Sequence, residues 1–338
     1  MPGNAVAFHP DANNGANGEV TWTSGQKLDN PCPSLNNNGN VPNKDDFTGI
    51  ASYNEEDSAS PPNTFLYGAE IRATANGNSS GNVELNQTQG PTATCSSPII
   101  RTAGDRLLAF GFTGGGTVLN FHALTWITPS NPTMGGNNGT CNISHDSPPC
   151  WGANVISSAS GITVGGCNST TANDVEGCSN QSAITAGNNG IDKTVLVAQQ
   201  FAEFGVNLTK VLGLTGCSAF PQEVWESRTS GSSFTSNPED IEIEHREIAN
   251  CGQIKIIKQT DPRGQGQNFG FTSSLPQNAS VGDVTCSGNA SAGIQPDGSF
   301  CLNDTGTPAR RRAAPTRLKT ARAIPSIPAP PCRRAVTP

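Results

Sequence analysis

The sequence predicts an all-β protein built from short strands and many turns. Its 338 residues include 38 glycines, 25 prolines and 34 asparagines. Glycine and asparagine disfavour helix interiors, and all three residue types are typical of turns. Charged residues make up only 14% of the chain and aromatic residues 6%. This composition argues against a helical bundle or a coiled coil and favours short strands packed as a sandwich.

The pattern changes at residue 41. Residues 1–40 form an Asn/Gly-rich segment, in which only Val20 to Trp22 has the composition of a strand. Residues 41–250 contain more apolar stretches and predict the main β-sandwich domain. The longest unbroken apolar run, 107–112, has six residues. Because a membrane-spanning helix needs about 20, we expect no transmembrane segment.

The strongest strands are expected at Arg106–Phe112 and Val118–Ile127, with weaker strands at 65–71 and 83–85. Three successive glycines between the two strong stretches can adopt the positive φ that a hairpin turn needs. Side chains around Phe110 are apolar on both faces of the first stretch. We therefore expect that strand to lie in the middle of a sheet.

Later elements are less regular. Residues 130–190 are predicted mostly as loop, which is long for a compact domain and indicates an excursion held by disulfide bonds. A strand is expected at 195–208, followed by a helical turn at 209–214 that Thr209 caps. Isoleucine alternates with acidic residues over 240–245, and this alternation predicts a half-buried strand.

Ten of the eleven cysteines precede residue 306, and no two of them form a Cys-x-x-Cys motif. Cytosolic metal sites usually show that tight spacing, so disulfide bonds in an exported protein are the better interpretation. Connectivity cannot be deduced from sequence, and the pairs that we favour are Cys141–Cys150, Cys167–Cys178, Cys217–Cys251, Cys286–Cys301 and Cys32–Cys95. The alternative is a zinc site at Cys141, His145 and Cys150, but a chain with four histidines and no second clustered pair argues against it.

The last 33 residues, 306–338, differ sharply from the rest of the chain. They carry a net charge of +8 without any acidic residue, whereas residues 1–305 carry −15. Three interpretations are open: a basic arm for nucleic acid or anionic surfaces, a disordered Pro/Ala/Arg tail, or a slip of the reading frame near Thr305. The abrupt change in composition favours the slip, and we expect a disordered tail and no nucleic-acid partner.

A second unit is expected from Cys251, where the string CGQIKIIKQTDPRGQGQNFGFTSSL begins. It resembles the opening of the prealbumin-like modules of large secreted surface proteins of actinobacteria and related bacteria, which are related to the B-type domains of collagen adhesins. Upstream, five strings resemble in order the N-terminal domain that often precedes such modules: VPNKDDFTG, RTAGDRLLAFGFTGGGTV, CNISHDSPPCWG, FAEFGVNLTKVLG and WESRTSGSSFTSNPEDIEI. The likeness covers about residues 40–305.

This resemblance implies an extracellular all-β protein without an established catalytic function. Its fold would be an antiparallel, jelly-roll-like β-sandwich domain (41–250) followed by an incomplete prealbumin-like β-sandwich module (251–305). It also makes Lys258 a candidate for an isopeptide bond, because related B-type domains can join such a lysine to Asn or Asp. The expected partner belongs to a final strand for which the chain offers no candidate, so an exposed strand lysine is the favoured interpretation.

Two patterns could indicate catalysis. Gly77-Asn-Ser79-Ser-Gly81 matches the GxSxG nucleophile elbow, but the residues after it do not predict the helix that the elbow needs. Asp240, Glu242 and Glu244 lie on one face of a predicted strand. Each is about 6.7 Å along the strand from the next one. A retaining glycosidase needs two carboxyl groups about 5–5.5 Å apart, so curvature could bring a pair into range. The string loosely resembles the E-x-D-x-E strand of jelly-roll glucanases, with Asp and Glu exchanged at the first and middle positions, and we favour a solvated face.

A calcium site is a further hypothesis. Asp45, Asp46 and Asp240 could contribute oxygen ligands, which hard cations prefer, but the sequence shows no EF-hand spacing. We therefore assign no metal, no cofactor and no catalytic residue.

These observations predict a non-enzymatic secreted or cell-surface protein of bacteria with a structural or adhesive role. Its partner would be an unknown extracellular protein or glycan. No signal peptide opens the chain, so either the leader has been removed or the start is missing. The alternative is an exported carbohydrate-binding or glycoside-hydrolase-like jelly-roll protein, which would show an exposed tryptophan beside Glu242 or Glu244. Its candidates for stacking on sugar rings are Trp22, Trp126, Trp151 and Trp225.

Overall fold

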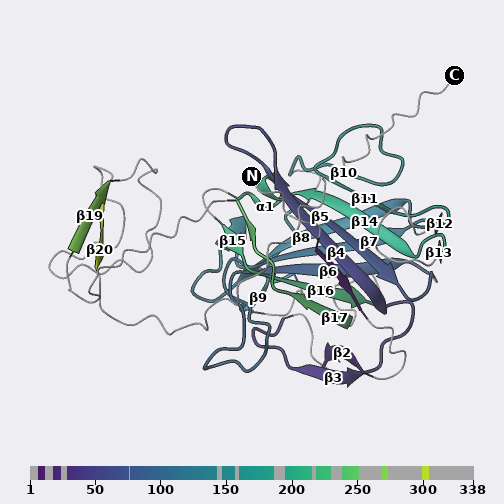
Figure 1. The fold of residues 1–338 in the computed structure, drawn as a ribbon, viewed down its shortest axis with the longest axis horizontal. Helices are drawn as coiled ribbons and strands as arrows, with labels where there is room; N and C mark the ends of the chain where they lie inside the picture. The colour runs from purple at the N-terminus through teal and green to yellow at the C-terminus, as the bar shows by residue number, and fades with distance from the viewer. Residues whose placement is uncertain are drawn as a thin grey trace, which may run out of the picture. The chain divides into compact units, whose positions relative to one another are not determined.

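Figure 1 shows a computed structural model of the chain, which divides into two units, Met1–Gly252 and Gln253–Pro338. The structure describes residues 7–11, 18–23, 29–75, 77–142, 147–156, 160–185, 195–214, 218–229, 238–250, 268–272 and 299–303. These residues are almost entirely strands and turns, so the prediction of an all-β protein with an antiparallel β-sandwich is confirmed.

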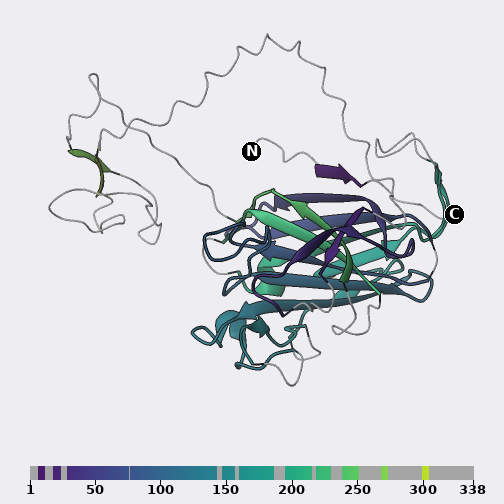
Figure 2. The same cartoon turned by 90° about the horizontal axis from the view of Figure 1, so that it is seen from below.

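Two six-stranded sheets form the sandwich of the first unit, and their strands lie in layers in Figure 2. The first sheet contains, in spatial order, β1 (Ala7–Pro10), β4 (Phe47–Glu56), β5 (Thr64–Arg72), β14 (Phe201–Asn207), β11 (Val175–Ser179) and β10 (Val164–Gly165). The second contains β17 (Pro238–Glu244), β16 (Gln222–Arg228), β6 (Ser79–Asn86), β7 (Arg106–Thr113), β8 (Val118–Ile127) and β9 (Cys150–Trp151). All neighbours within these sheets are antiparallel except β10 and β11.

The hydrophobic core lies between the two sheets. Phe110 of β7 packs on Phe204 of β14, with ring centroids 4.9 Å apart, and Trp225 of β16 lies 6.1 Å from Phe204. On the opposite face of β7, Leu107 joins a separate cluster with Trp126 and Trp151. The strand is buried on both faces and lies between β6 and β8, which confirms the predicted central position.

A third layer covers the outer face of the second sheet. The hairpin of β2 (Glu19–Trp22) and β3 (Leu35–Gly39) packs there, where Trp22 contacts a cluster that includes Ile241 of β17. The sequence predicted one strand fragment before residue 41, whereas the structure has β1, β2 and β3. The prediction missed β3 because its sequence, LNNNG, is mostly exposed and owes its strand conformation to backbone pairing with β2.

The segment 130–190 and the region after it contain more structure than predicted. Short elements occur there: η1 (Met134–Gly136), β12 (Ile184–Thr185), β13 (Val195–Leu196), α1 (Leu208–Leu212), β15 (Ala219–Phe220) and β18 (Ile248–Ala249). The predicted strand 195–208 is divided into β13 and β14 by a turn in which Gln199 has a φ of 67°. Asn207, not Thr209, caps α1, because its side chain accepts a hydrogen bond from the Lys210 amide at 3.0 Å.

The structure contains two of the predicted disulfide bonds, Cys32–Cys95 and Cys141–Cys150. The second bond engages both cysteines of the alternative zinc site, so that alternative is wrong. Cys167 and Cys178 are neighbours but remain free thiols, so the bridge predicted between them is not formed. Cys167 instead donates to the carbonyl oxygens of Gly116 and Ser179.

In the second unit, the structure describes one antiparallel hairpin of β19 (Asn268–Thr272) and β20 (Ser299–Asn303). The predicted strand at 269–272 falls within β19. Several other predictions lie outside the described residues: those on Cys217, Cys251, Cys286, Lys258, the tail 306–338 and the side chain of Cys301. Among the helices that the structure describes, none has the length and hydropathy to cross a membrane.

Candidate functional site

An open groove of about 680 Å³ lies on the outer face of the first sheet, over β4, β5, β14 and β11. Small residues form its floor. Ala51 of β4 pairs with Ala69 of β5, and Gly205 of β14 lies beside them, opposite Tyr67 of β5. The floor leaves space because these residues extend little above the backbone. The loop after β10, which includes Cys167, contributes one wall.

Tyr53 and Tyr67 lie over this groove, and they are the two tyrosines of the chain. They face each other across the β4–β5 pair, with ring centroids 6.0 Å apart in a stacked arrangement. Both hydroxyl groups donate to the carboxylate of Glu55, at 3.3 Å from Tyr53 and 3.0 Å from Tyr67. The Tyr67 ring lies against Gly205, where a Cβ atom would approach it to 3.0 Å. Tyr67 is nevertheless 40% exposed, so its ring is available to a ligand.

Acidic and thiol groups lie on the other side of the groove. Glu203 of β14 is opposite Cys178 of β11, and burial raises the pKa of Glu203. Burial, the neighbouring Cys167 and Glu203 together raise the pKa of the Cys178 thiol to about 12. At the groove's end, Asp174 accepts from Lys210 at 2.8 Å, and this contact helps to lower its pKa. At neutral pH the groove therefore offers carboxylate acceptors and a protonated thiol rather than a thiolate nucleophile.

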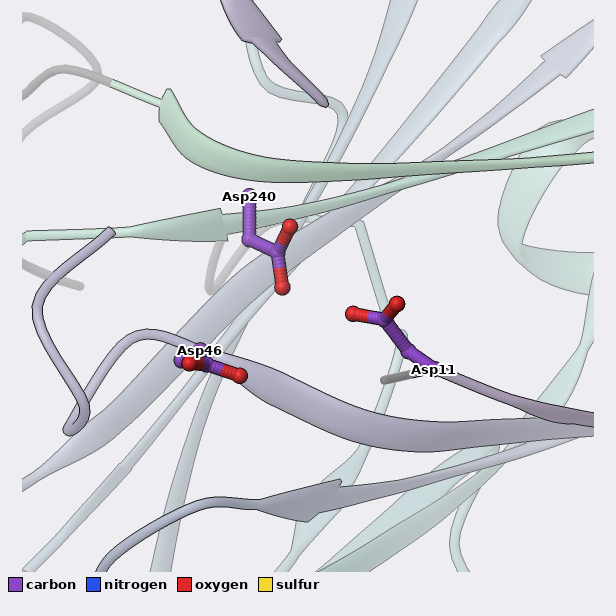
Figure 3. A group of neighbouring side chains, drawn as sticks. All are labelled: Asp11, Asp46 and Asp240. Atoms are coloured by element: carbon purple, nitrogen blue, oxygen red, sulfur yellow. The ribbon is translucent and has the colours of Figure 1, made fainter. Parts of the chain in front are cut away.

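A second feature lies between the two sheets, where three carboxylates converge (Figure 3). Asp11 directly follows β1, Asp46 directly precedes β4, and Asp240 lies on β17. One oxygen from each comes within 4.8 Å of the others. The Phe47 amide donates to Asp240 at 2.7 Å and so holds one carboxylate of the group at the start of β4.

Burial and the further carboxylates that surround the group raise the pKa values of two of its members. Burial, followed by Glu19 and Asp11, raises the pKa of Asp46 to about 7. Burial also raises the pKa of Asp240 to about 8, with added repulsion from Asp11, Glu19 and Glu242. The charged groups that shift these two pKa values are all carboxylates.

The predicted solvated face of Asp240, Glu242 and Glu244 is therefore wrong. Asp240 is fully buried, and the two glutamates are partly buried. The reason is the third layer, because β2 covers the isoleucine face of β17 and the acidic face turns towards the first sheet. The Glu244 carboxylate there contacts the His9 side chain of β1.

The calcium hypothesis named two residues of this group correctly and missed the third. Asp46 and Asp240 meet, whereas the Asp45 carboxylate pairs with Lys44 at 3.1 Å. Asp11 was missed because it falls in the segment for which the sequence predicted only one strand. Proline within a sheet occurs at edge strands, so Pro10 could have indicated an edge strand that ends just before Asp11.

The four tryptophans are not available for stacking. All four are buried, which contradicts their assignment as sugar-stacking candidates. Three of them surround the guanidinium of Arg101: Trp22, Trp126 and Trp151, with its central carbon 5.4–5.6 Å from each ring. The fourth, Trp225, lies opposite Glu242 in the strand pair but belongs to the core. Tyr67, which is exposed, and Tyr53, which is partly exposed, were missed, although both point outwards from long strands of the first sheet.

The GxSxG pattern does not form a nucleophile elbow. Ser79 begins β6, so a strand rather than a helix follows it, and its hydroxyl donates to the buried carboxylate of Glu70. No protein-family model, no curated protein and no solved structure matches this chain.

Proposed function

We propose that this chain is a non-catalytic extracellular binding module that recognises a saccharide in the groove of the first sheet. The observation that carries the proposal is the stacked pair Tyr53 and Tyr67 above a floor of alanine and glycine. An aromatic ring offers a flat apolar face to the C–H side of a sugar ring, while its hydroxyl remains able to hydrogen bond.

The polar groups of the groove suit the same ligand class. Glu203 and Glu176 line the same groove as the tyrosines, and sugar hydroxyls are donors that such carboxylate acceptors can bind. Glu55 fixes the orientation of both phenols, so little side-chain freedom remains to be lost on binding. The volume of about 680 Å³ falls within the range of about 300–1,000 Å³ that small-ligand sites occupy.

The disulfide bonds support the extracellular location that this proposal assumes. Two disulfide bonds are typical of proteins that mature in an oxidising compartment. Together with the resemblance to secreted bacterial surface proteins, they favour a role outside the cell. A glycosidase is less well supported, because Asp240 lies between the sheets rather than in an open cleft and Trp225 beside Glu242 is buried.

A glycan array probed with the full chain tests the proposal. We expect binding to one class of saccharide and a loss of about tenfold or more in affinity for Tyr67→Ala, which corresponds to about 1.4 kcal/mol. Met134→Ala is the control, because Met134 is an apolar side chain of similar exposure that does not line the groove. Unchanged binding by Tyr67→Ala and Tyr53→Ala would show that the groove is not the binding face. No binding to any saccharide would leave an extracellular protein as the ligand to be sought.

A further inference from the structure

The convergence of Asp11, Asp46 and Asp240 brings together three segments that are distant in the chain. In Figure 3 the carboxylates of Asp11 and Asp46 approach from the first sheet and that of Asp240 from the second, and all three point into a common space. A cluster of acids at a surface is common and implies no ligand. This cluster differs, because Asp46 and Asp240 are both fully buried.

Asp46 provides an independent sign that a ligand is missing. Its side chain is 0% exposed, and neither carboxylate oxygen has a hydrogen-bond partner in the part of the chain that the structure describes. A buried carboxylate without hydrogen bonds is strongly unfavourable, and proteins avoid it unless the group is protonated or binds a cation. Both oxygens of Asp46 therefore remain free to coordinate an ion.

A second buried aspartate shows what a satisfied carboxylate looks like in the same fold. Asp105 is also 0% exposed, but its oxygens accept hydrogen bonds from the backbone amides of Gln87 and Thr102 at 2.9 and 2.6 Å. Side chains of the same two residues add further bonds. Burial alone therefore does not explain why the carboxylate oxygens of Asp46 accept no hydrogen bond from the described residues.

The surroundings of the cluster favour a cation. Glu19 of β2 and Glu242 of β17 add two more carboxylates to the electrostatic environment of Asp240. Five carboxylates in one region repel one another strongly in a medium of low dielectric constant. A divalent cation would remove this repulsion and would also supply the partner that Asp46 lacks.

We propose that Asp11, Asp46 and Asp240 bind a calcium ion that joins the two sheets of the sandwich. Calcium takes oxygen ligands at about 2.3–2.6 Å, so ligands on opposite sides of the ion lie about 5 Å apart. Three oxygens that all lie within 4.8 Å of one another fit around such an ion. The donors are carboxylates only, which suits a hard cation and not zinc or copper.

The position of the site gives the ion a structural role. β1 and β17 are each the edge strand of their sheet, and both end the sandwich on the same side as the cluster. β1 is short and pairs with β4 over four residues, with the Phe8 ring packed against Gly49. An ion that binds Asp11 and Asp240 would fasten β1 across the open edge to the second sheet.

Calcium titration of the full chain tests the site without reference to any saccharide. After treatment with EDTA and dialysis, isothermal titration with calcium should show one site. The melting temperature should rise by about 5–10 °C at a calcium concentration 100-fold above the dissociation constant. Equal melting temperatures in EDTA and in calcium would overturn the proposal, and an equal rise with magnesium at the same concentration would overturn the choice of calcium.

Asp46→Asn is the decisive variant, because it keeps the shape of the side chain and removes the charge. In EDTA it should melt at or above the temperature of the wild type, because one repelling carboxylate is gone. In calcium it should show little or no rise. Retention of the full calcium-dependent rise in Asp46→Asn would contradict the proposal.

Two controls separate the site from general effects of acid removal. Asp105→Asn should destabilise the fold in EDTA and in calcium alike, because it disturbs hydrogen bonds and not an ion site. Glu247→Gln, at an exposed position, should change neither value. If Asp46→Asn fails to fold, terbium luminescence of the wild type replaces it. Excitation through tryptophan should then sensitise terbium in a calcium-displaceable way, and absence of that signal would count against the site.

Discussion

The second sheet carries buried charge on both of its faces, and the two clusters are completed differently. On the outer face, Arg101 donates to both oxygens of Glu84, and Glu226 lies 3.8 Å from the same guanidinium. On the inner face, Asp240 meets Asp11 and Asp46, and the charged groups that shift its pKa are all carboxylates. Among the described residues, the outer cluster therefore has an arginine between its carboxylates, whereas Asp46 and Asp240 of the inner cluster are surrounded by other carboxylates.

The difference follows from which segments cover each face. The segment 29–35 closes over Arg101, where the carbonyl of Asn30 accepts from the guanidinium at 2.8 Å and three tryptophan rings exclude water. The inner cluster is closed by strand ends instead, and strand ends contribute the side chains of acidic turn residues. The side chains of the covering segment therefore determine whether a buried carboxylate in this fold lies next to a cation or next to other acids.

Loss of Arg101 should have the largest effect on the fold. Arg101→Met removes the guanidinium that pairs with the buried carboxylate of Glu84 and lies near that of Glu226, and we expect the free energy of unfolding to fall by about 3–5 kcal/mol. Denaturant unfolding monitored by tryptophan fluorescence measures it. The double variant Arg101→Met/Glu84→Gln should recover part of the loss, because it removes the uncompensated charge as well. If Arg101→Met alone is as stable as the wild type, Arg101 does not stabilise the outer cluster, and the difference between the two clusters is refuted.

The disulfide beside this cluster should have the next largest effect. Cys32–Cys95 closes a loop with a sequence separation of 63 and anchors the segment that covers Arg101. Replacing both cysteines with serine should cost about 4 kcal/mol, against about 2.5–3 kcal/mol for Cys141–Cys150, whose sequence separation is 9. Unfolding in urea compares the two double variants directly. Equal losses would show that loop length does not govern the difference.

The inner cluster should make stability depend on pH. The pKa of Asp46 is raised to about 7 and that of Asp240 to about 8 by burial and by the surrounding Asp11, Glu19 and Glu242, whereas an unfolded aspartate titrates near 4. The folded state then holds more protons between these values, so the contribution of these two groups to stability is full at low pH and is lost as the pH rises through their folded pKa values. In EDTA, the contribution of Asp46 alone should make the protein about 3 kcal/mol less stable at pH 8 than at pH 5.

Urea unfolding at the two pH values, with Asp46→Asn beside the wild type, measures this contribution. The variant should lose most of the difference. A wild type and a variant with the same pH dependence would show that Asp46 is not the group that titrates. Saturating calcium should also reduce the dependence in the wild type.

The smallest effect is expected in the groove, where the carboxylate of Glu55 is exposed and already accepts hydrogen bonds from both tyrosines. Burial and the carboxylate of Glu55 raise the pKa of the Tyr67 phenol to about 12. In Glu55→Gln the pKa should fall towards its ordinary value near 10. Ultraviolet difference absorbance in a Tyr53→Phe background follows this one phenol, and Glu56→Gln serves as the control on the same strand. A value that stays near 12 in Glu55→Gln would assign the shift to burial alone.

The sequence predicted those parts of the fold that depend on apolar pattern. β7 was recognisable because Leu107 and Phe110 fill opposite faces of one strand, and only a central strand has apolar neighbours on both sides. β1 and β3 were not recognisable, because backbone pairing and not side-chain pattern makes them strands. The same limit applied to β17, where alternation identified the strand but could not show which face would be covered.

The candidate sites depended still more on tertiary structure. Asp46 and Asp240 are separated by most of the first unit, and the chain brings them together only when the two sheets pack. The paired tyrosines could have been found from register, because Tyr53 and Tyr67 both occupy outward positions on adjacent strands. The tryptophans misled the prediction for the opposite reason, because Arg101 draws three of them into the interior.

The short strand β1 has a consequence for solubility. It pairs with residues 49–52 on the outer edge of β4, a strand of ten residues. Open strands of this length are templates for pairing with another copy of the chain. A strand held by four residue pairs and an ion is a cover that can be removed without unfolding the sandwich. Chelation should therefore promote self-association well below the melting temperature, and light scattering would detect it before any change in secondary structure.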